Sequence, residues 1–118
     1  MAIVNHQLIT TQLDALTVPA GKRYAITNIM VCNSYSPSGP SAASRDATFD
    51  LHLIPNGSAK NDQVTIVVKE LTLPAGETFT FDSEKIVLDE GDIIAFVASP
   101  DIGSGLTDLA TTVSYLEV

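Results

Sequence analysis

Cysteine, tryptophan and long apolar runs are scarce or absent in this chain of 118 residues, which has one cysteine and no tryptophan. A single cysteine, Cys32, cannot form an intrachain disulfide, which excludes the small secreted domains that disulfides hold together. The longest apolar run, residues 93–98, is far shorter than the roughly 20 residues that a membrane helix needs. Residues 1–6 lack the basic and apolar regions of a signal peptide, so we expect no secretory leader.

Basic residues are also few, with six Lys and Arg against fourteen Asp and Glu, for a formal net charge of −8. They are scattered along the chain and form no basic stripe, and an acidic protein repels phosphates. We therefore expect no nucleic-acid partner and no membrane partner. The length fits one domain, residues 1–118, and 45% hydrophobic residues are too many for a disordered chain.

The pattern of the chain is β throughout. Apolar and polar residues alternate, and no window of eleven residues has sustained helical spacing. Turn signals separate the apolar runs: Pro-Ala-Gly at 19–21 and again at 74–76, and Asn-Gly at 56–57. The expected strands are 7–13, 23–32, 48–54, 63–73, 77–81, 85–88, 92–99 and 107–116, with a helical turn at 12–16. The sequence predicts a single-domain antiparallel β-sandwich or jelly roll of about eight strands.

Alternation also predicts which side chains are buried. The expected core is Phe49, Leu51, Leu53, Ile66, Val68, Phe79, Phe81, Ile94, Phe96 and Val113. Residues 23–32 are apolar on both faces, which predicts a central strand or one covered by another chain. We expect Ala25, Ile29 and Val31 to lie on the outer face of this strand. We expect Cys32 to be a buried thiol.

Candidate catalytic and metal residues are few. Asp50 and His52 share one face of their predicted strand, but no nucleophile motif such as G-x-S-x-G accompanies them, so we expect an exposed polar pair rather than a catalytic centre. Zinc sites need three or four ligands at short spacing, which one cysteine and two distant histidines do not supply. We therefore expect no enzyme, no metal and no cofactor.

One acidic cluster leaves an alternative open. Oxygen ligands from neighbouring turns could bind calcium, although the cluster lacks the spacing of a calcium-binding loop. Solvated turn carboxylates are the other interpretation, and the one we expect. The cluster consists of Asp82, Glu84, Asp89, Glu90 and Asp92.

Two segments are candidates for contacts with other proteins. Residues 33–46 are rich in serine and proline and predict a long loop, a kind of segment that is often functional in a compact domain. The N-terminal arm, residues 2–13, is apolar enough either to cross a neighbouring copy and extend its sheet or to pair within its own sandwich. The expected interface residues are Ile3, Val4, Leu8 and Ile9 in the arm, and Tyr35, Pro37 and Pro40 in the loop.

The phrases VPAGKRYAITNIMVCNS, FDLHLIP, LTLPAGETFTFDSEKIVLDEGDIIAFVAS and TTVSYLEV together resemble small virion structural proteins of tailed phages, especially marine ones. The resemblance covers residues 18–118, and the chain departs from it in the length of its serine- and proline-rich loop. It implies a β-sandwich without catalytic residues that is assembled on the head or tail of the particle.

Within that resemblance, the expected role is a capsid decoration subunit, located in the virion after assembly in the host cytoplasm. Its expected partners are other copies of itself, with a cyclic trimer as the implied symmetry, and the major capsid or tail protein. A tail, baseplate or fibre-adaptor component is one alternative. A glycan- or receptor-binding module that uses Tyr35 and the loop is another.

Overall fold

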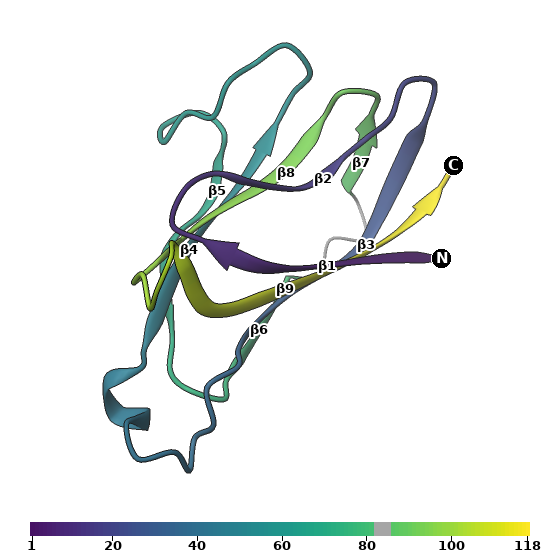
Figure 1. Cartoon of the computed structure of the whole chain (residues 1–118). Helices are drawn as coiled ribbons and strands as arrows, with labels where there is room; N and C mark the ends of the chain where they lie inside the picture. Colours follow the sequence, from purple (N-terminus) through teal and green to yellow (C-terminus); the bar gives the residue numbers. More distant parts are fainter. Residues whose placement is uncertain (82–85) are drawn as a thin grey trace.

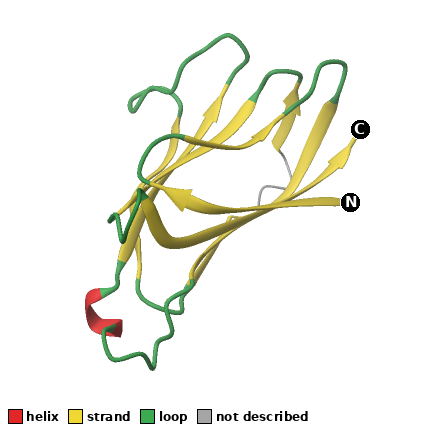
Figure 2. Ribbon diagram, viewed as in Figure 1, coloured by secondary structure: helices red, strands yellow, loops and turns green. Residues whose placement is uncertain are grey.

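Nine β-strands make up most of the computed structural model, which describes residues 1–81 and 86–118. The strands are β1 (Ala2–Ile9), β2 (Leu13–Thr17), β3 (Arg23–Asn33), β4 (Ala47–Ile54), β5 (Ile66–Leu73), β6 (Thr78–Phe81), β7 (Ile86–Asp89), β8 (Ile93–Ser99) and β9 (Leu106–Glu117). The short 3-10 helix η1 (Ala42–Ser44) is the red segment of Figure 2. In these described ranges, no helix is long and apolar enough to cross a membrane.

The strands form two antiparallel sheets that pack face to face (Figure 1). One sheet has the order β1-β9-β3-β6, with β7 also paired to β3, and the other has the order β2-β8-β4-β5. The first strand pairs with the last, β2 with β8, β3 with β6 and β7, and β4 with β5, which is jelly-roll topology. The predicted fold class is confirmed. The described residues hold nine strands rather than eight, because β1 and β2 stand where one strand, 7–13, and a helical turn were expected.

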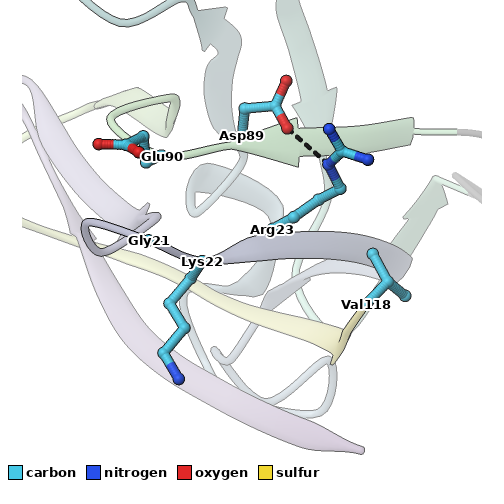
Figure 3. Close-up of a pocket in the computed structure, with 6 residues that line it drawn as sticks. All are labelled: Gly21, Lys22, Arg23, Asp89, Glu90 and Val118. Atoms are coloured by element: carbon cyan, nitrogen blue, oxygen red, sulfur yellow. Dashed lines mark hydrogen bonds and ion pairs between the residues drawn. The ribbon is translucent and has the colours of Figure 1, made fainter.

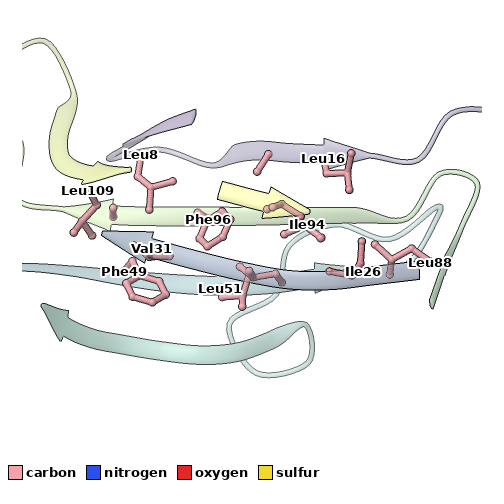
Figure 4. Close-up of a cluster of buried hydrophobic side chains, with 14 of the residues drawn as sticks. Leu8, Leu16, Ile26, Val31, Phe49, Leu51, Leu88, Ile94, Phe96 and Leu109 are labelled. Carbon is pink, nitrogen blue, oxygen red and sulfur yellow. The ribbon is translucent and has the colours of Figure 1, made fainter. Parts of the chain in front are cut away.

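Apolar side chains from both sheets fill the space between them (Figure 4). Half of the predicted core is fully buried: Phe49, Leu51, Ile94, Phe96 and Val113. The other half is only partly buried: Leu53, Ile66, Val68, Phe79 and Phe81. Most of the second group lies on β5 and β6, which are edge strands and have a neighbour on one side only.

Both Pro-Ala-Gly sequences form the predicted turns. The amide of Lys22 donates to the carbonyl oxygen of Pro19, and the amide of Glu77 donates to that of Pro74, each at 3.1 Å. Gly21 and Gly76 have φ of 77° and 79°, a region that favours glycine. The helical turn expected at 12–16 is wrong, because residues 13–17 form β2 and pair with β8.

The central position predicted for residues 23–32 is confirmed, but their faces are not as predicted. The pairing of β3 with β9 shifts register between Ile26 and Asn28. This bulge reverses the alternation, so Ile29 and Val31 are fully buried instead of lying outside. Cys32 is correspondingly half-buried rather than enclosed in the core.

Candidate functional site

The N-terminal arm pairs within its own sandwich. Residues 2–9 form β1, which lies along β9 at the edge of its sheet. Leu8 is fully buried in the core, so its expected role as an interface residue is corrected: its side chain is covered by its own chain and cannot reach a neighbour. Val4 packs partly against the core and Ile9 is half-buried, whereas Ile3 is 60% exposed. Of these four residues, Ile3 is the one that leaves most of its surface exposed.

The connection between β3 and β4, residues 34–46, which we call the long loop, is tied to the sandwich at both ends by Asn33. The side chain of Asn33 is fully buried and makes three hydrogen bonds. Its Nδ2 donates to the carbonyl oxygens of Arg45 and Leu73 at 2.8 and 2.9 Å, and its Oδ1 accepts from the amide of Tyr35 at 3.1 Å. Sequence reasoning missed this residue, since an asparagine at a strand end resembles any turn residue.

A second anchor lies at the base of the long loop. Arg45 donates two hydrogen bonds to the carboxylate of Asp108 in β9, at 2.8 and 2.9 Å, and the hydrogen bonds raise the pKa of Arg45. The guanidinium also lies over the ring of Tyr35, 4.4 Å from its centroid. Asp108 is buried, so the ion pair is shielded from salt. The long loop is therefore fixed to the sandwich rather than trailing from it.

The three expected interface residues of the long loop are used in different ways. Tyr35 contacts Arg45 and accepts from the amide of Ser41 at 3.3 Å, so one face of its ring is covered by its own chain. Pro37 packs on the β5–β6 turn, where a Cβ atom at Gly76 would lie 2.8 Å from the proline ring. Pro37 and Pro40 both remain exposed. Together with the exposed serines they form the outward surface of the loop.

Exposed apolar side chains cross the outer face of the β1-β9-β3-β7 sheet. Ala25 of β3 lies between Val87 of β7 and Leu116 of β9 in the strand register, and Ile3 of β1 is the diagonal neighbour of Leu116. Val87 and Leu116 are 53% and 40% exposed. We call Ile3, Ala25, Val87 and Leu116 the outer patch. The sequence predicted an apolar outer face here, but the bulge in β3 replaces two of its expected members.

An open hollow lies at the end of the sandwich where β3 begins and β7 ends (Figure 3). Both of its basic residues are paired: Arg23 lies 2.7 Å from Asp89, and Lys22 points away, toward Glu117 at 3.1 Å. Asp92, a member of the acidic cluster, accepts from the amides of Asn56 and Asp89. Asp82 and Glu84 lie outside the described residues. Of the described members of the cluster, Asp89 pairs with Arg23, Asp92 holds a turn and Glu90 is exposed.

Asp50 and His52 are not the exposed polar pair that the sequence predicts. His52 is fully buried, although it lies on the outer face of β4, because the β4–β5 connection folds back over it. Its Nδ1 lies 2.8 Å from Thr65 Oγ1, and its Nε2 lies 3.7 Å from Oδ1 of Asp62. Burial lowers the pKa of His52, with a further lowering by Lys60, so the ring is neutral at neutral pH. Spacing along the chain could not identify Asp62 or Thr65 as its neighbours.

Lysines accompany both carboxylates beside His52. Lys60 Nζ lies 2.9 Å from Oδ1 of Asp62, and this hydrogen bond lowers the pKa of Asp62. Lys69 Nζ lies 3.4 Å from Oδ2 of Asp50, whose charge raises the pKa of Lys69. The region holds no serine, threonine or cysteine placed as a nucleophile toward His52 Nε2 among the described contacts.

Comparison of the chain with protein-family models, with curated proteins and with solved structures finds no match.

Proposed function

We propose that this protein is a non-enzymatic structural subunit of a virus particle, a capsid decoration protein that assembles as a homo-oligomer. The observation that carries the proposal is the outer patch, which exposes apolar side chains on adjacent strands of one sheet. Contiguous apolar surface is costly in water, and partners cover it in proteins that assemble. Jelly-roll sandwiches are common in viral capsid domains, which supports a place in the virion but does not by itself assign a function.

The charge of the chain decides what kind of contact can hold such an oligomer. At −8, two copies repel each other at a distance. Apolar burial and backbone pairing at the free edge of β1 must therefore supply the attraction. Because salt screens the repulsion and leaves apolar burial intact, association should persist in high salt.

The experiment is sedimentation velocity of the purified chain at micromolar concentration, at low and at high salt. We expect an oligomer, and we expect I3K or V87K to shift it toward the monomer because a lysine in the outer patch must be desolvated on association. Both positions are more than half exposed, so the variants should fold. The matched control is I102K, which changes an exposed isoleucine in the β8–β9 loop, outside the patch. A monomeric wild type, or equal dissociation in the control, would contradict the role of the patch.

The place in the particle needs a separate measurement. Quantitative proteomics of purified virions should give a copy number in proportion to the major capsid protein. A small fixed number of copies would instead favour the tail, baseplate or fibre-adaptor alternative. Complete absence from the particle would refute the virion assignment.

A further inference from the structure

A buried histidine with an unused ring nitrogen faces two carboxylates on the outer side of the β2-β8-β4-β5 sheet. His52 and Asp50 lie two residues apart on β4 and share its outer face. Asp62 comes from the connection that folds back over this strand. One nitrogen or oxygen of each residue lies within 4.8 Å of the others.

The hydrogen bonds around His52 occupy Nδ1 and leave Nε2 without a partner among the described residues. Thr65 Oγ1 donates to the carbonyl oxygen of Asn61 at 3.0 Å and lies 2.8 Å from His52 Nδ1. Thr65 Oγ1 also accepts from the amide of Asn61 at 3.0 Å. With the hydroxyl hydrogen on Asn61, Thr65 accepts from Nδ1 of His52, which is the tautomer that a metal bound at Nε2 requires. In this tautomer Nε2 carries a lone pair. Among the described residues this atom has no hydrogen-bond partner, although it is fully enclosed.

The neighbour of that lone pair is itself an acceptor. Asp62 Oδ1 lies 3.7 Å from Nε2. In the tautomer with the hydrogen on Nδ1, an imidazole lone pair and a carboxylate oxygen have no hydrogen to share. A cation between the two atoms satisfies both. Histidines that bind metals through one nitrogen hold the ring with a hydrogen bond from the other, as Nδ1 does here to Thr65.

The second carboxylate is already oriented. Asp50 Oδ1 accepts from the amide of Glu70 at 2.7 Å, which leaves Oδ2 as the oxygen for a cation. Each carboxylate lies beside a lysine ammonium group: Lys69 Nζ is 3.4 Å from Asp50, and Lys60 Nζ is 2.9 Å from Asp62. The two lysine side chains are 51% and 28% exposed, so each ammonium can turn into solvent when a divalent ion replaces it.

We propose that Asp50, His52 and Asp62 bind a zinc ion, with Nε2 of His52 as the nitrogen ligand. An imidazole with two carboxylates suits zinc, whereas calcium and magnesium prefer oxygen alone. Bonds of about 2.0–2.2 Å place tetrahedral ligand atoms about 3.3–3.5 Å apart, so the three side chains need shifts on the order of 1 Å. A solvent molecule would be the fourth ligand. The ion would fasten the β4–β5 connection to β4, and this inference does not depend on the proposed assembly.

The experiment is calorimetric titration of the chelator-treated full chain with zinc chloride, and with cobalt chloride as a spectroscopic probe. We expect one zinc per chain, and a loss of affinity of more than about ten-fold in D62N and in H52Q. K60A should bind zinc more tightly than wild type, because its ammonium no longer competes for Asp62. H6Q is the matched control, since His6 is the other histidine of the chain, and its affinity should equal that of wild type.

Asp62 is exposed, so D62N should keep the fold and decides the question if H52Q does not fold. The proposal is overturned if wild type shows no saturable zinc binding, if D62N binds as tightly as wild type, or if H6Q loses as much affinity as the cluster variants. Calcium that binds as tightly as zinc would overturn the assignment of His52 as a ligand. Weaker or equal binding in K60A would overturn the placement of the ion at Asp62.

Discussion

Phe96 tests the packing of the two sheets most directly. Its side chain is fully buried on β8, and its ring lies 6.2 Å from that of Phe49, which in turn contacts Phe79 of the opposite sheet. A buried phenylalanine removes about 150–250 Å² from water, which at ~25 cal/mol per Å² corresponds to about 4–6 kcal/mol. Alanine retains part of this burial, so F96A should lower the free energy of unfolding by about 3–5 kcal/mol.

The assay is urea unfolding of wild type, F96A and F81A, followed by circular dichroism. Phe81 is a phenylalanine of the same size that is only partly buried on the edge strand β6, so F81A should cost roughly half as much or less. Domains of this size are stable by about 5–15 kcal/mol, which leaves F96A measurable if the wild type lies within that range. A loss below about 1 kcal/mol, or a loss no larger than that of F81A, would refute the packing described here.

Three further predictions concern the long loop, a titrating group and a turn. R45A should increase cleavage of the long loop by chymotrypsin in limited proteolysis. The urea midpoint for unfolding of the whole sandwich should change only slightly in the same variant. Burial lowers the pKa of His52, so the unfolded state takes up its proton at a higher pH than the folded state. In the presence of a chelator, the free energy of unfolding should therefore be constant above pH ~6.5 and should fall as the pH drops from there through the lowered pKa. The difference between the free energies of unfolding of wild type and H52Q isolates this pH dependence. G91A should be more destabilising in urea than G21A, because both glycines have positive φ but only at Gly91 would a Cβ also meet an asparagine side chain.

Local patterns predicted much of this fold, since strands and turns depend on neighbouring residues. Alternation identified β4, a short β-rich apolar run identified β8, and each Pro-Ala-Gly sequence forms its turn. The faces of β3 could not be predicted, because the bulge is a property of its pairing with β9. In that pairing Asn28 lies opposite Ser114, which is more than 80 residues away along the chain. The helical turn at 12–16 failed for the same reason: pairing with β8 determines that segment.

The candidate sites were less predictable than the fold. The sequence placed His52 correctly on the outer face of its strand but could not show that the following connection covers it. Ligand spacing along the chain argued against zinc, yet Asp62 reaches His52 through a fold of the chain and not through a motif. Leu8 was assigned to a contact with a neighbour because its strand is apolar, whereas apolar residues on an edge strand still face their own core.

The position of β9 has a consequence for synthesis of the protein on the ribosome. β9 lies between β1 and β3, and Ala2 pairs with Tyr115. A nascent chain that has not yet released residues 106–117 thus has an unpaired β1 and a sheet divided at its centre. Such sequence-distant pairing slows folding, and unpaired strands in the meantime are prone to aggregate. The native sheet therefore forms only after residues 106–117 have left the ribosome, and the acidic charge of the chain helps keep waiting copies apart.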